Sequence, residues 1–156
     1  MYKDSYASGF LYHPSTRQIL LQQQKQARDT APLWSLFGGI GKSRDNAQIT
    51  FQRVIHKLLH IKLKLNTIEP VYVYFYKDTD KNHSILYAEI AKTKNFSSKR
   101  GVKFSWFTFK QILKLQLDKQ TRHDIIVGQR VIDAKERKRL GQQFHGETVL
   151  HPSPTL

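Results

Sequence analysis

The stretch LFGGIGKSRDNAQITFQRVIHKLLHI, residues 36–61, decides the fold. It begins as a short strand-like segment that ends at Gly38-Gly39, where the chain can take positive φ and turn sharply. Asp45 or Asn46 is a suitable N-cap for a helix that should run to about His60. Apolar residues recur at helical spacing, which predicts a broad buried face, and they are Ile49, Phe51, Val54, Ile55, Leu58 and Leu59.

The segments before and after this stretch predict strands. Residues 6–14 and 17–24 are apolar runs on either side of a His-Pro-Ser-Thr turn cluster, which indicates a hairpin. Residues 69–77 and 83–92 are rich in β-branched and aromatic residues and predict a second strand pair. Strands, a helix, more strands and then helices favour a mixed sheet with helices packed on its faces.

The C-terminal third predicts helices. Residues 102–109 form a last strand that leads into a short helix over residues 110–117. Asp118 and Thr121 are caps for a final helix that should end at about Leu140, with Gly141 closing it. We therefore expect one domain over residues 1–140 and a draped or disordered tail over residues 141–156.

The composition indicates a folded globule. A chain of 156 residues with 39% hydrophobic and 12% aromatic residues can bury a core of its own. The absence of cysteine excludes disulfides and thiolate zinc sites. No apolar run has the length of a signal peptide core or of a membrane span, which needs about 18 residues. We expect a cytoplasmic protein with no membrane partner.

The charge is strongly positive. Lys and Arg total 26 against 12 acidic residues, so the formal net charge is +14 and the pI is near 10.1. Such a surplus attracts phosphate groups of nucleotides, nucleic acids or anionic lipids. The basic residues are spread along the chain, with one denser run over residues 134–140, and a solvated basic surface is the plain alternative.

The opening stretch resembles the Nudix box, in which a glycine, an upstream Glu, an Arg and a cluster of Glu residues stand at fixed spacing. Gly39, preceded by Gly38, takes the place of the glycine, and Asp45 stands where the box has its first Glu. Arg53 matches the box arginine. The order of strands and helices around the box is also similar, over roughly residues 5–140. The resemblance implies a Nudix-type α/β/α sandwich with a mixed β-sheet and hydrolysis of diphosphate-linked nucleosides.

The carboxylate cluster of the box is missing. The family's metal-binding positions, which lie three and four residues apart on one helix face, hold Val54, Lys57 and Leu58. Hydrolysis of a diphosphate needs a divalent ion that offsets phosphate charge and generates hydroxide, and Mg²⁺ takes oxygen ligands. Two apolar groups and an ammonium do not supply them. We expect hydrolysis to be weak or lost, and no cofactor to be required.

The same change favours direct binding of an anion. Lys57 can contact a phosphate as a point charge, and Lys42 and Arg44 add positive charge in the Gly-rich loop. Backbone N–H groups at the start of the helix favour an anion as well. The sequence therefore predicts a site for a nucleotide or another phosphorylated ligand, built from Gly38, Gly39, Lys42, Arg44, Arg53 and Lys57. For Arg53 we favour a structural role, bonded to loop carbonyls.

Two alternative functions stay open. An active hydrolase requires metal ligands outside the box, for which Asp45 and Glu89 are the residual candidates, with Glu69 as a third carboxylate and Mg²⁺ or Mn²⁺ as the ion. A nucleic-acid-binding or regulatory module would use the last helix, whose predicted basic side holds Arg122, Arg130, Arg137, Lys138 and Arg139. Tyr72, Tyr74 and Tyr76 alternate along one strand and can stack bases, although packing into the core is the commoner use. Trp34 is expected in the core. The oligomeric state is not encoded in any of these patterns.

Overall fold

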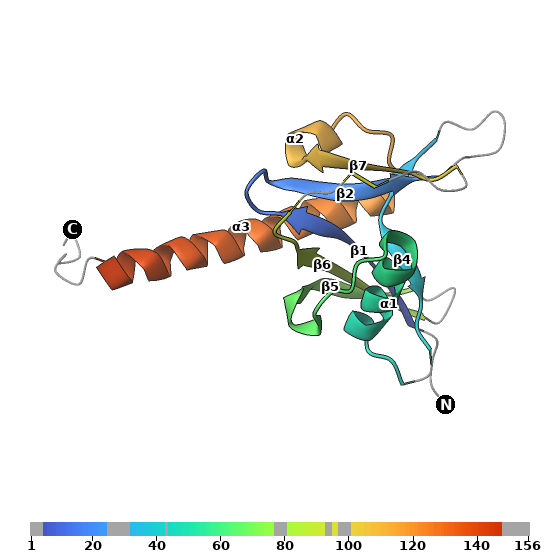
Figure 1. The fold of residues 1–156 in the computed structure, drawn as a ribbon, viewed down its shortest axis with the longest axis horizontal. Helices are drawn as coiled ribbons and strands as arrows, with labels where there is room; N and C mark the ends of the chain where they lie inside the picture. The colour runs from blue at the N-terminus through green and yellow to red at the C-terminus, as the bar shows by residue number, and fades with distance from the viewer. Residues whose placement is uncertain are drawn as a thin grey trace.

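The structure is a computed structural model that describes residues 5–24, 32–42, 44–76, 81–92, 95–96 and 101–147. A single sheet carries helix α1 on one face and helix α3 on the other (Figure 1). The strands are β1 (Ser5–His13), β2 (Gln18–Gln23), β3 (Trp34–Ser35), β4 (Phe37–Ile40), β5 (Ile68–Tyr76), β6 (Lys81–Glu89) and β7 (Lys103–Thr108). The helices are α1 (Ala47–Leu59), α2 (Phe109–Ile112), α3 (Lys119–Glu147) and a 3₁₀ turn, η1 (Leu65–Thr67).

The sheet is mixed because its central strand, β1, has neighbours of both directions. β1 runs parallel to β6 and antiparallel to β2 and β4. The strand order is β3-β2-β1-β6-β5, with β4 on β1 and β7 on β2. Both predicted hairpins, β1–β2 and β5–β6, are confirmed, as is the α/β/α sandwich with a mixed sheet.

Strand alternation divides the core into two layers. Ala7 and Leu11 of β1 face α1, whose Phe51, Ile55 and Leu59 are buried against the sheet. Phe10 and Tyr12 face the other way and pack with residues of α3. The predicted apolar face of α1 is confirmed, although Val54 and Leu58 are only partly buried at the edge of this layer.

The double glycine does not turn the chain, which corrects the prediction. β4 continues through Gly38 and Gly39 to Ile40, and it pairs with β1 throughout. In the loop between β4 and α1, the described residue with positive φ is Arg44, at 74°. A Cβ on Gly38 would lie 2.4 Å from the Tyr6 hydroxyl, and one on Gly39 would lie 2.7 Å from Val54 Cγ2. The glycines are therefore needed for close packing on both faces of β4.

Helix limits differ from the predictions mainly near the C-terminus. Asn46 caps α1 by accepting a hydrogen bond from the Ile49 N–H at 2.8 Å, as one of the two predicted caps. α2 is shorter than predicted and ends at Ile112. α3 runs through Gly141 to Glu147, so the predicted end at Leu140 is wrong.

The length of α3 moves the predicted boundary of the tail. An interior glycine costs a helix only about 1 kcal/mol, and good helix formers surround Gly141, so the helix continues past it. Residues 141–147 of the predicted tail are thus helical, and residues 148–156 lie outside the described residues. Among the described helices, none is both long and apolar enough to cross a bilayer.

Candidate ligand-binding site

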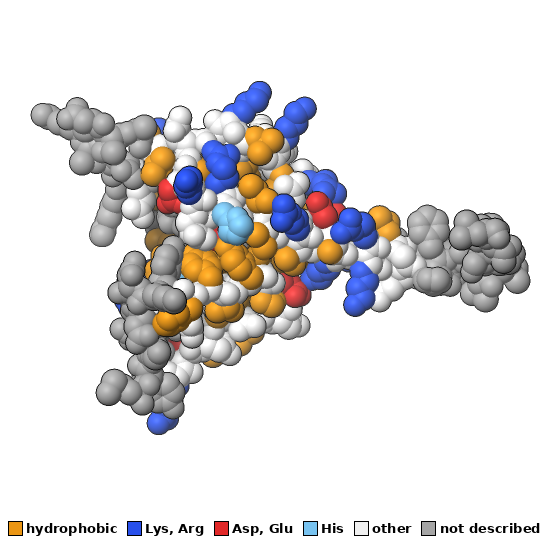
Figure 2. Space-filling model, turned by 180° about the vertical axis from the view of Figure 1, so that it is seen from behind, with side chains coloured by type: hydrophobic (Ala, Val, Ile, Leu, Met, Phe, Trp, Pro, Cys, Tyr) orange, Lys and Arg blue, Asp and Glu red, His pale blue; other side chains and the backbone are white. Residues whose placement is uncertain are grey.

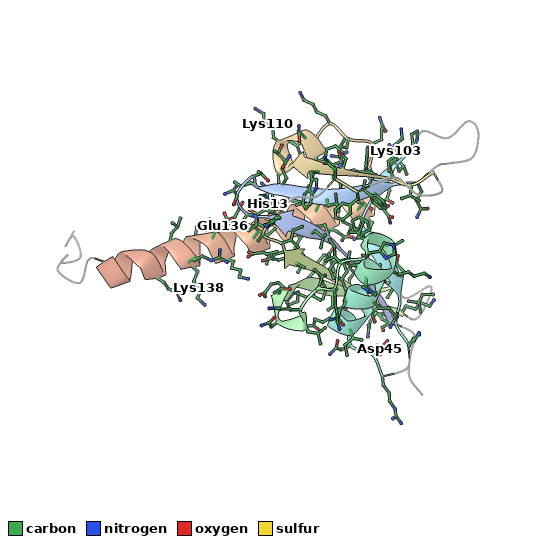
Figure 3. All side chains as sticks on the ribbon, in the orientation of Figure 1. His13, Asp45, Lys103, Lys110, Glu136 and Lys138 are labelled. Atoms are coloured by element: carbon green, nitrogen blue, oxygen red, sulfur yellow. The ribbon has the colours of Figure 1, made fainter. Side chains whose placement is uncertain are left out.

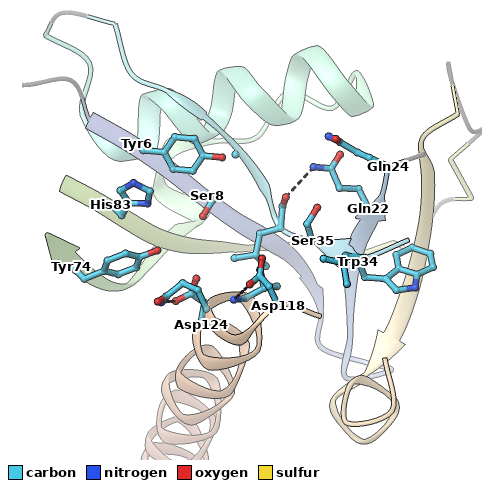
Figure 4. A pocket seen from close by; sticks show the side chains of 15 residues that line it. Tyr6, Ser8, Gln22, Gln24, Trp34, Ser35, Tyr74, His83, Asp118 and Asp124 are labelled. Atoms are coloured by element: carbon cyan, nitrogen blue, oxygen red, sulfur yellow. Dashed lines mark hydrogen bonds between the residues drawn. The ribbon is translucent and has the colours of Figure 1, made fainter. Parts of the chain in front are cut away.

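The α3 face of the sheet has a cavity of about 480 Å³ beside the first turns of α3 (Figure 4). Tyr6 and Ser8 of β1 and Gly38 of β4 contribute to its lining. The volume is within the range of small-molecule sites, roughly 300–1,000 Å³. Trp34 and Ser35 of β3 and the first turn of α3 also contribute to the lining.

Stacked rings form one wall of the cavity. The Tyr6 and His83 ring centroids are 4.8 Å apart, and those of His83 and Tyr74 are 5.2 Å apart, with 29° between the planes in both pairs. The three side chains come from the adjacent strands β1, β6 and β5. Burial lowers the pKa of His83, which favours its neutral form. On the other side, Trp34 lines the cavity and packs edge-on against Phe107.

Two carboxylates flank the cavity at the start of α3 (Figure 4). Asp118 caps the helix by accepting a hydrogen bond from the Thr121 N–H at 2.7 Å. Asp124 is 3% exposed and accepts hydrogen bonds from the Tyr72 hydroxyl and from Gln120 Nε2. Burial raises the pKa of Asp124, and these two hydrogen bonds act in the opposite direction.

The lining chemistry suits the polar edge of a flat ring or a sugar. Side-chain amides of Gln22, Gln24 and Gln120 join the two carboxylates, and neither Lys nor Arg occurs among the lining residues that the structure describes. Gln22 is fixed by a 2.9 Å hydrogen bond from its Nε2 to the Leu36 carbonyl. A phosphate inside this cavity would meet carboxylates without a compensating cation, so charged phosphates belong outside it.

Arg53 joins α1 to the loop between β4 and α1, the segment that resembles the Nudix box. One guanidinium nitrogen lies 2.5 Å from Asp45 Oδ2, and the other donates to the Ile40 carbonyl at 3.0 Å. The structural role predicted for Arg53 is confirmed. The Asp45 carboxylate is therefore paired with the Arg53 guanidinium.

The helix face that carries metal ligands in Nudix proteins is apolar here. Val54 and Leu58 pack against the buried layer between α1 and the sheet, and Lys57 is exposed. A hydrocarbon side chain has no lone pair to offer, and the ammonium between these positions repels a cation. The residues present at 54, 57 and 58 do not fit a divalent metal.

The predicted ligand residues do not all meet at the cavity. Of the six, only Gly38 lines it. Gly39 lies against Val54, and Lys42 and Arg44 follow β4 as exposed residues. The loop that carries Lys42 and Arg44 is thus connected to the cavity only through β4, whose Gly38 lines it.

The residual carboxylates are far apart. Ile40, shortly before Asp45, pairs with Tyr6, whereas Glu89 pairs with Tyr12. Tyr6 and Tyr12 are six positions apart along β1, a distance of roughly 20 Å. Instead, Glu89 Oε1 lies 3.5 Å from Arg139 Nη2, and Glu89 lines a second cavity together with Glu69. No group of three or more His, Asp or Glu residues in the described part of the chain is placed to hold a metal ion.

The five cations predicted as one surface of α3 are divided. Arg122 donates to the Ile112 carbonyl at the end of α2 and, at 2.8 Å, to the Leu115 carbonyl just after it, so it fixes α2 to α3. Arg139 pairs with Glu89 on β6. The other three, Arg130, Arg137 and Lys138, are exposed. Arg139 is exposed as predicted, although it also pairs with Glu89, whereas Arg122 is only partly exposed, because sequence spacing does not show which turn meets a carboxylate or a helix end.

Several lining residues were not found from the sequence. Asp118 was interpreted only as a cap, and Trp34 was assigned to the core, although it is half-buried and also lines the cavity. Tyr6, Ser8 and the buried Phe10 are two positions apart along β1. This spacing was a usable signal that they lie on one face of the strand. No local pattern marked His83 or Asp124, because their proximity depends on the pairing of β1 with β6 and on the docking of α3.

Comparison with known proteins identifies the fold. MutT of Aliivibrio salmonicida or Vibrio cholerae superposes with a TM-score of 0.64 at 9% identity, over 82% of this chain and 96% of that one. The ORF135 protein of E. coli gives 0.64 at 15% identity, over 86% and 94%. The Nudix domain of Shewanella oneidensis NrtR, complexed with ADP ribose, gives 0.64 at 13% identity, over 85% and 90%.

The chain therefore has the Nudix fold, and the resemblance seen in the box is confirmed at the level of the fold. No family model matches the sequence, and no curated protein matches it. The identities of 9–15% leave the function to be argued from the site itself.

Proposed function

We propose that this Nudix-fold protein binds a nucleotide or another ligand with a diphosphate group and hydrolyses it weakly or not at all. The cavity beside α3 is the observation that supports this function. The Tyr6 and Tyr74 rings and Trp34 offer apolar surface to a base, which stacks favourably on aromatic groups. Asp118 and Asp124 accept hydrogen bonds from an amino group or a ribose hydroxyl.

The phosphates of such a ligand leave the cavity along β4. Past Gly38 the chain reaches the exposed Lys42 and Arg44, and the N-terminal end of α1 follows. Positive side chains and free N–H groups at a helix start attract anions. The NrtR domain of the same fold is complexed with ADP ribose, a nucleotide with a diphosphate, which supports this ligand class.

Weak or absent hydrolysis follows from the chemistry of α1. Val54 and Leu58 pack against the core, and Lys57 stands between them on the exposed side. Lys57 can contact a phosphate oxygen directly, and binding then requires no divalent ion. The alternative of an active hydrolase loses support because Asp45 is bonded to Arg53 and Glu89 lies at the other end of β1.

Thermal unfolding with ADP ribose and with nucleoside diphosphates, each in EDTA and in Mg²⁺, tests the proposal. We expect a rise in Tm that is equal in the two conditions, because a ligand bound only to the native state stabilises it. Tyr74→Ala should remove the rise. Phe75→Ala is the matched control, since Phe75 is the next residue on β5, is 47% exposed and lies on the opposite face. A rise that requires Mg²⁺, or rapid Mg²⁺-dependent release of phosphate, would refute the proposal.

A further inference from the structure

The C-terminal half of α3 projects beyond the sheet as a free helix (Figure 1). Among its described side chains the large exposed apolar residue is Leu140, which is 54% exposed. A single leucine does not make the apolar stripe with which a helix inserts into a membrane or a protein groove. Over its described side chains, this surface can therefore recognise a partner only by charge.

The acidic residues of α3 face the body of the protein. Asp124 is buried in the first turns and is bonded to Tyr72. Asp133 and Glu136 are held by Arg17 at 2.9 Å and 2.8 Å, and Glu136 also accepts from the Tyr12 hydroxyl. These three are the acidic residues between Lys119 and Gln142, so this part of the helix directs its negative charge inward.

Apart from the exposed Lys119 at its first residue, the Lys and Arg residues of α3 are of two kinds. Arg122, Lys135 and Arg139 contact the α2 carbonyls, Glu69 and Glu89 respectively. Arg130, Arg137 and Lys138 are exposed, and none of them takes part in an ion pair between described residues. Lys and Arg side chains accordingly gather along the projecting helix in Figure 2.

Helix geometry brings these three exposed cations together. Arg130 and Arg137 are seven residues apart, nearly two turns, so they lie on the same side about 10 Å apart along the axis. Lys138 follows by about 100° around the helix. The fully buried Ile132 lies on the opposite side of the helix from Arg130.

We infer that Arg130, Arg137 and Lys138 form a surface that binds the phosphate backbone of a nucleic-acid duplex. The spacing suits neighbouring phosphates, the nearest carboxylates of the helix, Asp133 and Glu136, are paired with Arg17, and the formal net charge of +14 favours the encounter. The described side chains of α3 include no Phe, Tyr or Trp on which unpaired bases could stack, so a duplex is favoured over a single strand. This surface is independent of the cavity proposed to bind a nucleotide.

Fluorescence anisotropy with a labelled 20-base-pair DNA duplex, over a range of salt concentrations, tests the inference. Three phosphate contacts give a slope of log K against log salt of about −2.7, equivalent to roughly 40-fold weaker binding at 200 mM than at 50 mM. In the triple variant Arg130→Gln, Arg137→Gln, Lys138→Gln, the magnitude of this slope should be smaller by about 2 to 3 than in the native protein. These are exposed positions, and a native thermal transition establishes that the variant is folded.

The matched control removes the same charge elsewhere. Lys103 on β7, Lys110 on α2 and Lys114 just after α2 are exposed, and in Figure 3 the first two lie away from Lys138. Replacing these three by Gln should change the slope by less than 1. Equal losses in both triples, binding to poly-glutamate or a single strand of the same charge as tight as binding to the duplex, or no duplex binding at 50 mM salt would each overturn the inference.

Discussion

The Arg53 guanidinium on α1 lies 2.5 Å from the Asp45 carboxylate in the loop that precedes the helix. Its other nitrogen donates to the carbonyl of Ile40, the last residue of β4. These contacts fix the loop between strand and helix. The arrangement of strand, loop and helix is thus maintained by an arginine and an aspartate, and the next turn of the helix holds no carboxylate.

Arg53→Ala should therefore destabilise the fold without touching the cavity. It removes a partly exposed ion pair and a hydrogen bond to a carbonyl, which together contribute about 1 to 2 kcal/mol. Urea unfolding measures the change. Lys57→Ala, an exposed change on the same helix, should stay within about 0.5 kcal/mol of the native protein. Equal losses in the two variants would show that the Arg53 contacts are not structural.

Restoring the carboxylates should restore a response to metal. The variant with Glu at positions 54, 57 and 58 should unfold at a lower temperature in EDTA, because Val54 and Leu58 pack against the core. Mn²⁺ should then raise its Tm, whereas the Tm of the native protein should not change with Mn²⁺. Lys57→Glu alone should lose little stability, since Lys57 is exposed. A native protein that Mn²⁺ stabilises would contradict this reading of α1.

Asp124 should make the free energy of unfolding decrease as the pH rises. Burial raises its pKa above the ordinary 3.8, so the folded state holds this proton more tightly than the unfolded state. The contribution of Asp124 to stability is thus greatest below pH 3.8 and falls as the pH rises through the raised pKa. The free energy of unfolding of the native protein, relative to Asp124→Asn, should decrease over that window.

Tyr72→Phe is the partner experiment for Asp124. The Tyr72 hydroxyl donates to the carboxylate and lowers its pKa, so removing that hydroxyl should raise the pKa of Asp124 further. The decrease in stability should then extend to higher pH. Urea titrations between pH 3.5 and 7 measure both effects, and an unchanged window in the variant would show that the hydrogen bond does not favour the ionised form.

Two glycines of α3 should respond oppositely to alanine. A Cβ on Gly141 meets no atom within 4 Å, so Gly141→Ala should stabilise the helix by up to about 1 kcal/mol. A Cβ on Gly128 lies 3.0 Å from the buried Phe10 ring, so Gly128→Ala should give no gain or a loss. Circular dichroism and thermal unfolding measure helicity and stability. Destabilisation by Gly141→Ala would indicate that the helix ends at that residue, as the sequence first suggested.

Local patterns carried most of the fold. The apolar run in residues 6–14 predicted β1, which is buried on both faces, and the apolar spacing in residues 49–59 predicted α1, because burial of one helix face imposes a period on the sequence. The same patterns failed at Gly38-Gly39 and at Gly141. A glycine is read from sequence as a turn or a helix end, but here one pair is needed for contacts with Tyr6 and Val54, and the other residue is tolerated inside a helix.

The sequence alone determined that positions 54, 57 and 58 hold no carboxylate, whatever the packing around them. Only the tertiary structure decided where a ligand can be held and which cations stay exposed. The parallel pairing of β1 with β6 places His83 between Tyr6 and Tyr74, and the docking of α3 places Asp124 beside them. Except for the hairpin neighbours Tyr74 and His83, these contacts join residues more than thirty positions apart, and no local periodicity encodes such a meeting.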